Sequence, residues 1–186
     1  MKKPTKNILL VHSSNDLYGA SKILISIIEL LLISKYSVFL ILPKNGPLNN
    51  HPTIMKTSLT TINMGVFRKK YLNFFGLLNR SLFIIKSTLE IKKYIKKNDI
   101  NLLYNNTSTI ISSTLAAYLS KIPIIYHIHE IPASSKIYTK FLVNFFTLFS
   151  NKVISVSDSV KNYWISNGLS EDKITTIYNG FKFNFK

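Results

Sequence analysis

The chain has 186 residues, 46% of them hydrophobic, so it is long enough to bury one compact core and fits a single domain. It contains no cysteine, which excludes disulfides, thiolate metal sites and cysteine nucleophiles. Its formal net charge of +16 favours anionic partners such as phospholipid, nucleic acid or sugar nucleotides, although a general compositional bias toward Lys, Asn and Ile explains the charge equally well.

The first segment combines a strand pattern, a polar loop and a helix pattern. The apolar run Ile8–Val11 predicts a strand, and it is too short for the core of a signal peptide, so we expect a cytoplasmic protein. A helix follows whose apolar residues recur at three- and four-residue spacing, which predicts one stripe toward a sheet. The members of that stripe are Ile23, Ile27, Leu30 and Leu31.

The longest predicted helix covers Leu72–Lys97. Its apolar stripe, expected to face the sheet, consists of Phe74, Leu78, Leu82, Ile85 and Leu89. Basic and aromatic residues alternate from Phe67 and Arg68 to Lys97, and two interpretations stay open for them. Either the stretch holds the domain on an anionic membrane surface, or it is an ordinary sheet-covering helix with a solvated basic face.

The rest of the chain repeats the strand and helix alternation, with Ser157 or Asp158 as the N-cap of the last helix. Further helices are expected at Ser108–Ser120, Ile137–Ser150 and from Asp158. The expected strands after the first are Val38–Leu42, Thr60–Met64, Leu102–Asn105, Ile124–Ile128, Val153–Val156 and Ile174–Tyr178. Strands joined by helical crossovers predict an α/β, Rossmann-like three-layer domain with a mostly parallel sheet of about seven strands.

Ligands of open parallel sheets bind at the carboxyl ends of the strands, so the polar residues there are candidates for a cleft. His127 and His129 share one face of a strand end, where they can bind a metal, act on a hydroxyl or only satisfy polar groups. No further metal ligands are evident, and no metal is expected. Asn105 and Thr107 also suit a simple turn or helix cap. The candidates are His12, Asn105, Thr107, His127, Glu130 and Ser157.

Gly19 opens the first helix, where the missing side chain allows either a phosphate to approach the helix N-terminus or a simple tight turn. The sequence has neither the dinucleotide-binding glycine fingerprint nor a P-loop motif.

Three segments, taken in order, resemble the N-terminal domain of glycosyltransferase family 4. They are residues 8–25, ILLVHSSNDLYGASKILI; residues 122–130, IPIIYHIHE; and residues 153–180, VISVSDSVKNYWISNGLSEDKITTIYNG. The resemblance implies one half of a GT-B fold, in which this half receives the acceptor and a second domain holds the sugar nucleotide. It also implies hexosyl transfer with retention of configuration, from a sugar nucleotide to a polysaccharide or lipid-linked acceptor, without a metal or other cofactor.

By the same resemblance, Gly19 and Ala20 lie against the donor diphosphate, and His129 contacts the transferred sugar or supports its developing charge. Asn179 and Gly180 lie where the chain leaves for the second domain. The sequence departs from the family pattern in having Ala20 for a second glycine, Ser21 or Lys22 for an acidic residue, and Lys182 for Asp or Asn.

No two glutamates stand eight positions apart, as the donor-binding domain of the family requires. We therefore expect residues 1–186 to be the N-terminal domain alone, inactive by itself and either truncated or completed by a second chain. The alternative is a noncatalytic module that keeps an acceptor-binding or membrane-binding surface. Nucleic acid is not expected as a partner, because no recognised binding motif accompanies the charge.

Overall fold

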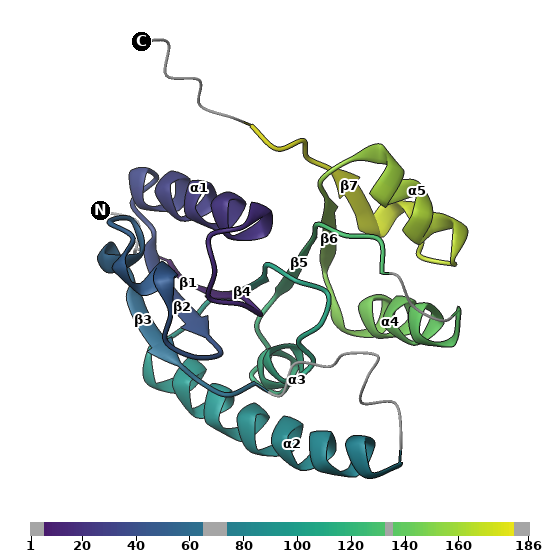
Figure 1. The fold of residues 1–186 in the computed structure, drawn as a ribbon, viewed down its shortest axis with the longest axis horizontal. Helices are drawn as coiled ribbons and strands as arrows, with labels where there is room; N and C mark the ends of the chain where they lie inside the picture. The colour runs from purple at the N-terminus through teal and green to yellow at the C-terminus, as the bar shows by residue number, and fades with distance from the viewer. Residues whose placement is uncertain (1–5, 65–73, 133–135, 181–186) are drawn as a thin grey trace.

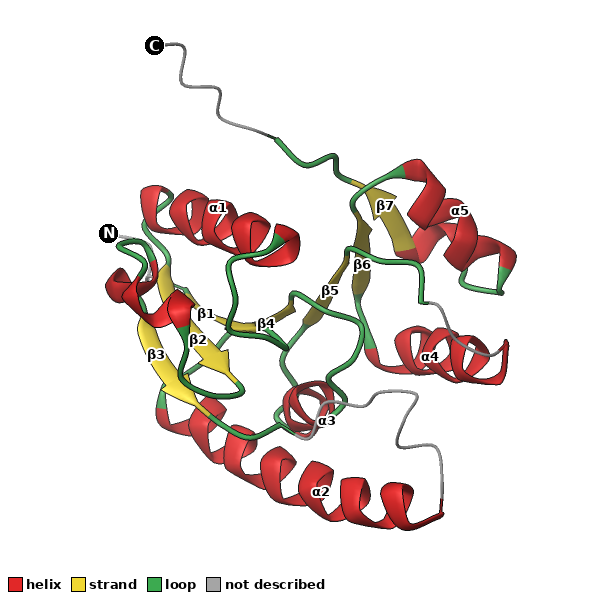
Figure 2. Cartoon of the chain, viewed as in Figure 1, coloured by secondary structure: helices red, strands yellow, loops and turns green. Residues whose placement is uncertain are grey.

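The computed structural model describes residues 6–64, 74–132 and 136–180. Seven strands form one sheet in the order β3-β2-β1-β4-β5-β6-β7, and every neighbouring pair is parallel. Figures 1 and 2 show helices on both faces of this sheet, which confirms the α/β, Rossmann-like expectation. The strands are β1 (Asn7–Val11), β2 (Ser37–Leu42), β3 (Ser58–Thr61), β4 (Leu102–Asn105), β5 (Ile124–Ile128), β6 (Lys152–Ser155) and β7 (Ile174–Thr176).

Five α-helices connect these strands in the described part of the chain: α1 (Gly19–Ile33), α2 (Phe74–Lys97), α3 (Ser112–Leu119), α4 (Lys136–Phe149) and α5 (Asp158–Ser166). Short 3-10 turns lie at Pro47–Asn50, Ile54–Lys56 and Glu171–Lys173. Helix α1 covers one face of the sheet, while α2, α3 and α4 cover the other (Figure 1). Parallel strands require such crossovers, so the layers follow from the strand order.

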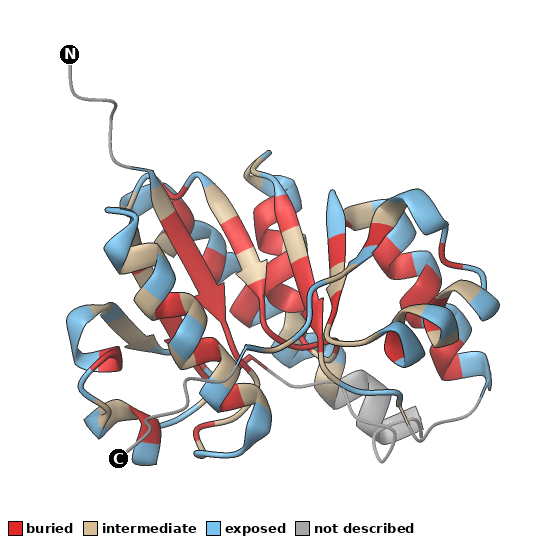
Figure 3. Cartoon of the chain, turned by 90° about the horizontal axis from the view of Figure 1, so that it is seen from above, coloured by how far each residue is buried: buried red, intermediate tan, exposed pale blue. Residues whose placement is uncertain are grey.

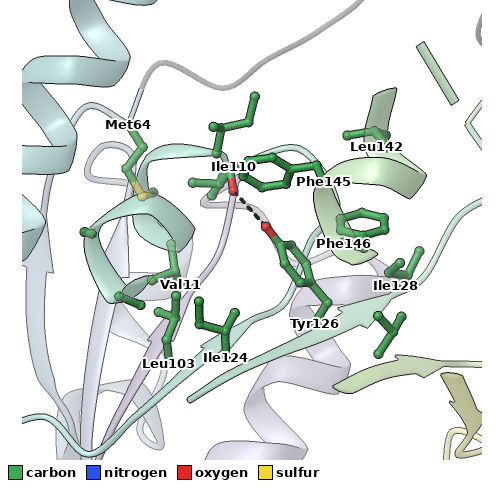
Figure 4. Close-up of a cluster of buried hydrophobic side chains, with 14 of the residues drawn as sticks. Val11, Met64, Leu103, Ile110, Ile124, Tyr126, Ile128, Leu142, Phe145 and Phe146 are labelled. Atoms are coloured by element: carbon green, nitrogen blue, oxygen red, sulfur yellow. Dashed lines mark hydrogen bonds between the residues drawn. The ribbon is translucent and has the colours of Figure 1, made fainter. Parts of the chain in front are cut away.

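The larger of two hydrophobic cores lies between the sheet and the layer of α2, α3 and α4. Figure 4 shows Tyr126 of β5 among aliphatic side chains and Phe146, with its hydroxyl 3.4 Å from the carbonyl oxygen of Ile110. The ring of Trp164 from α5 packs against Phe146 at 5.3 Å between centroids. Buried residues therefore run along the strands and inner helix faces, as Figure 3 shows.

The prediction for the sheet-facing stripe of α1 was confirmed only in part: Ile27 and Leu31 are half-buried and pack against the core. The fully buried residues of the helix are Ser21, Leu24 and Ile28. Leu30, which we expected inside, is 63% exposed. The Ser21 hydroxyl lies 3.0 Å from His12 Nε2 at the end of β1, and this contact turns Ser21 and the residues one and two turns later inward.

In α2 the predicted stripe was wrong at Leu82, Ile85 and Leu89, which point to solvent. The side chains of Phe74 and Leu78 are not among those that the structure describes. The buried side of this helix instead carries Ser87, Thr88, Ile91 and Ile95. The small residues allow a close approach to α3, where Thr88 Oγ1 donates to the carbonyl oxygen of Ser112. Leu72, the basic cluster at residues 68–70 and Lys182 lie outside the described residues.

Several element boundaries differ from the sequence prediction. Strand β3 lies at Ser58–Thr61 rather than Thr60–Met64, because Leu59 to Thr61 pair with the last residues of β2. Helix α3 begins at Ser112, four residues later than expected, because the preceding residues form a polar turn. Strand β7 ends at Thr176, and Ile177 and Tyr178 are exposed.

Candidate functional site

The direction of strand order reverses between β1 and β4, which is where open α/β sheets form their ligand crevice. His12 directly follows β1, and Asn106 directly follows β4. His12 Nδ1 lies 3.2 Å from both the backbone oxygen and the side-chain nitrogen of Asn106. His12 Nε2 contacts the hydroxyls of Ser21 at 3.0 Å and Ser14 at 3.1 Å, so this buried ring joins β1, β4 and α1.

Asn106 links this histidine to a second one. Its amide nitrogen donates to the carbonyl oxygen of Ala20 at 3.0 Å, which leaves the amide oxygen to accept from His129 Nε2 at 2.8 Å. His129 must therefore carry a hydrogen on Nε2, and its Nδ1 holds the lone pair of a neutral ring. The ring is half-buried, just beyond β5. One buried amide thus sets the position and the tautomer of His129.

Burial, and then the neighbouring rings of His127 and His12, lower the pKa of His129 to about 3. Burial also lowers the pKa of His127 to about 4 and holds the pKa of His12 below its usual 6.5. The three imidazoles are therefore neutral at pH 7. At this pH they offer hydrogen-bond donors and acceptors but no positive charge.

His127 lies next to His129, with 4.3 Å between ring centroids, but it is 4% exposed. Its Nδ1 is 2.9 Å from the hydroxyl of Tyr104, and its Nε2 has no hydrogen-bond partner within the described residues. His127 borders a cavity of about 390 Å³ on the α1 side of the sheet. The same cavity is lined by Asn179 and Gly180, so these two residues and His127 border one cavity.

The loop between β1 and α1 is held by its own polar side chains. Asp16 accepts hydrogen bonds from the backbone N–H of Tyr18 at 3.1 Å and the hydroxyl of Ser21 at 3.0 Å. Burial opposes the charge of Asp16, but these bonds outweigh it and lower the pKa of the carboxyl group. The Asn15 amide oxygen accepts from the backbone N–H of Leu48, which ties the loop to the segment after β2.

Next to this loop, a cavity of about 510 Å³ opens at the carboxyl ends of the first strands. It is lined by Ser13, Ser14, Asn15, Asp16, Pro43, Lys44 and Asn63. Gly19 begins α1 and has no atom within 4 Å of the position that a Cβ would take. The first turn of α1 is therefore open to a ligand, and the N–H groups of a first helical turn have no partner within their helix.

Two predicted cleft residues are not in the cleft. Asn105 is completely buried on the α3 side of the sheet, where its amide nitrogen donates to Thr114 Oγ1 and its amide oxygen accepts from the Ser113 hydroxyl. As the last residue of β4 it points opposite to the residue that follows it. Thr107 is also buried, and its hydroxyl contacts that of Thr109 within the turn.

Two other predicted cleft residues, Ser157 and Glu130, lie after the carboxyl ends of their strands and make structural contacts. The Ser157 hydroxyl accepts from the backbone N–H of Val160, which makes Ser157 the N-cap of α5. Glu130 is exposed, and its carboxylate accepts from the Ser108 hydroxyl at 3.0 Å. Within the described residues, no three His, Asp or Glu side chains are grouped so that they could hold a metal ion.

Sequence reasoning missed Tyr104, and it gave no individual role to Asp16 and Asn106 within the polar segments that follow β1 and β4. Tyr104 precedes Asn105 in β4, so strand alternation places it on the face opposite to Asn105, where His127 lies. Strand alternation could have distinguished Asn106 from Asn105, because the residue that follows a strand points away from the strand's last side chain.

The fold and this crevice define a Rossmann-like domain with a polar binding edge at the strand-order reversal. The model of Glycosyltransferase Family 4 matches residues 19–184, so the chain belongs to this family. No curated protein sequence matches the chain.

Several solved structures share this fold. Anabaena Alr3699/HepE in complex with UDP and glucose aligns with a TM-score of 0.70 and 20% identity, over 95% of this chain and 45% of that one. A glycosyltransferase from Rickettsia africae ESF-5 aligns with a TM-score of 0.64 and 22% identity, over 96% of this chain and 44% of that one. Acinetobacter baumannii MurG aligns with a TM-score of 0.65 and 14% identity, over 95% of this chain and 47% of that one. The chain therefore spans less than half the length of these structures.

Proposed function

We propose that this chain is the acceptor-side half of a retaining hexosyltransferase that acts between a sugar nucleotide and a polysaccharide or glycolipid acceptor. The observation that carries the proposal is the hydrogen-bonded path from Ala20, at the start of α1, through Asn106 to His129. It joins the helix end suited to a diphosphate with the imidazole suited to a sugar. The complexes of HepE with UDP and glucose, and with UDP-glucose, support sugar nucleotides as the donor class.

In this proposal the open first turn of α1, at Gly19 and Ala20, faces the donor diphosphate and stabilises its departing negative charge. His129 accepts a hydrogen bond from a sugar hydroxyl at Nδ1, since Asn106 already takes the hydrogen on Nε2. A neutral ring orients the sugar without repelling the positive charge that develops on it. The sugar nucleotide is a substrate, and we propose no metal or other cofactor.

The acceptor side is the cavity of about 510 Å³ beside the loop after β1. Hydroxyl and amide groups of Ser13, Ser14 and Asn15 line it, together with Lys44, and such groups suit sugar hydroxyls. We further propose that Asn179 and Gly180 lead to a donor-binding half, supplied by more of the same polypeptide or by a second chain. The enzyme would then work in the cytoplasm or on the inner face of the plasma membrane, in cell-surface polysaccharide or glycolipid synthesis.

Imidazole NMR of the 186-residue chain tests this assignment without needing turnover. On titration with UDP- and GDP-hexoses, the His129 signals should shift, and the signals of His51, in the connection between β2 and β3, should not. Catalysis needs both faces of the cleft, so the chain alone should transfer no sugar. Transfer by the chain alone, or sub-micromolar nucleotide affinity, would show that the donor site is misplaced.

A donor half supplied in trans extends the test to the reaction. The anomeric configuration of the product should be retained, as proton NMR can determine, and an inverted product would contradict the proposal. If no donor half restores transfer although the His129 signals respond to acceptor sugars, the noncatalytic acceptor-binding alternative is favoured.

A further inference from the structure

A groove crosses the edge of the sheet that lies opposite the crevice. Two cavities, of about 660 and 480 Å³, open there beside the residues that precede β4, β5 and β6. Leu119 and Ile122 line both cavities, so the two form one groove that runs from the last turns of α2, past the end of α3, to the end of α4. We call it the amino-edge groove, because it lies at the amino ends of these strands.

The amino-edge groove has an apolar floor and apolar walls. Ile95 and Ile100 line it and are almost completely buried, whereas Leu119, which stands between the two cavities, is 52% exposed. At the α4 end, the rings of Tyr118 and Phe149 meet edge to face with 5.1 Å between their centroids. A recess of this kind between helices can accept the apolar side chains of a ligand.

The rim of the groove is basic. Lys92, Lys93 and Lys96 of α2 line one cavity, and Lys121, just past α3, lines the other. All four lysines are exposed, and none of their side chains makes a hydrogen bond or an ion pair within the described residues. Asp99 is the one acidic residue among those that line the groove. The negative end of the α2 dipole favours a lysine in the last turn, but it does not explain the lysines outside that turn.

The shape and the charge of the groove select among partners. Nucleic acid would pair with the lysines but would leave the apolar floor unfilled. A second copy of the chain carries a net charge of +16, which opposes its approach to a cationic rim. Across residues 6–64, 74–132 and 136–180, no helix is long and apolar enough to cross a membrane. A flat lipid surface would meet the rim and not the recessed floor. An amphipathic helix fits both parts, because its apolar stripe fills a groove while carboxylates beside the stripe reach the lysines.

We infer that the amino-edge groove docks a partner protein through an amphipathic helix whose apolar stripe is flanked by Asp and Glu. The strands at the groove, β4, β5 and β6, are each paired on both sides, so they offer no sheet edge to an extended peptide. The crevice lies at the carboxyl ends of the strands, so a helix in the groove leaves the crevice open. The inference does not depend on the proposed sugar transfer.

A peptide selection tests both the occupant and its place. A phage library of random peptides of about 16 residues, long enough to form a helix, is selected against the immobilised chain. The enriched peptides should carry apolar residues at three- and four-residue spacing, with an excess of Asp and Glu beside them. Fluorescence anisotropy of the free peptides then gives their dissociation constants, which should rise with salt.

Two groove variants divide the contact into its parts. The apolar variant combines Leu89→Ser with Leu119→Ser, and the charge variant combines Lys92→Gln with Lys96→Gln. The apolar variant should weaken peptide binding on the order of tenfold or more, and the charge variant should weaken it about fivefold.

Matched control variants lie away from the groove. One combines Leu30→Ser with Ile33→Ser on α1, where these side chains are 63% and 75% exposed, and the other combines Lys22→Gln with Lys56→Gln. Both should bind the selected peptides within about twofold of the wild type. All four variants should keep the thermal midpoint of the wild type, because every altered side chain is exposed.

Four results would overturn the inference. The first is a selection that enriches no acidic amphipathic peptide. The second is an apolar variant that binds the peptides as well as the wild type does, which would mean that the lysines attract any polyanion, nucleic acid included. The third is a control variant that loses as much binding as its groove counterpart, which would place the peptides elsewhere. The fourth is self-association of the chain in sedimentation that the groove variants abolish, which would make a second copy the occupant. Peptide binding needs no sugar nucleotide, so none of these results bears on the proposed transfer reaction.

Discussion

Acidification should destabilise the fold through its buried histidines, and His127 gives the clearest measure. Its pKa is about 4 in the folded protein and 6.5 in the unfolded chain. Between these values the unfolded chain binds the extra proton, so stability falls as the pH falls through this window. From these two pKa values, we expect the protonation of His127 in the unfolded chain to lower the free energy of unfolding by about 2 kcal/mol between pH 7 and pH 5. His129 and His12 act in the same direction.

Urea unfolding at pH 7 and pH 5 measures this loss, and Trp164, the single tryptophan, is buried in the core and reports it by fluorescence. The variant His127→Gln removes the titrating ring, so its loss between the two pH values should be about 2 kcal/mol smaller than that of wild type. An equal pH 7 to pH 5 loss in wild type and His127→Gln would refute the reasoning.

Further substitutions test the polar framework of the crevice and the packing around two glycines. Asn106→Ala should lower the free energy of unfolding by about 2 to 3 kcal/mol, because it leaves buried partners without hydrogen bonds. It should also broaden the imidazole NMR signals of His129. Sharp, unshifted His129 signals would contradict the role of this amide. Gly46→Ala should lower the free energy of unfolding by about 1 to 3 kcal/mol, since the new Cβ would lie 2.6 Å from the backbone oxygen of Asn15. Gly19→Ala should leave the free energy of unfolding almost unchanged, because no atom lies within 4 Å of its new Cβ. Similar urea midpoints for the two alanine variants would contradict the packing argument.

The strands could be predicted because each apolar run is short and ends at polar residues, as at Val11 and His12. The rotation of α1 about its own axis could not be predicted, because this helix is apolar on several sides. Ile23 and Ile27 form one plausible stripe, and Leu24 and Ile28 form another at the same spacing. A long-range contact from Ser21 to His12 selects the second stripe, and hydrophobic periodicity does not contain that contact.

The crevice shows the same division between local and long-range information. That polar residues gather after β1, β4 and β5 follows from the parallel topology. Which of two adjacent asparagines enters the crevice depends on the register of β4, where Asn105 pairs with Val11 and turns its side chain toward α3. Only then does Asn106 meet His12, 94 residues earlier in the chain. A sequence read in windows cannot fix a register that two distant strands determine together.

The core packing of α2 also determines which side chains its outer surface carries. This helix has two apolar arcs, and only one can face the sheet. Ser87 and Thr88 stand on the arc that packs, where their small side chains let α3 come close and where Ser87 bonds back to the carbonyl oxygen of Phe83. Had Leu82, Ile85 and Leu89 served the core instead, Ser87, Thr88, Ile91 and Ile95 would face solvent. The close approach to α3 therefore leaves the larger side chains of Leu82, Ile85 and Leu89 outward, beside the exposed lysines of the same helix face.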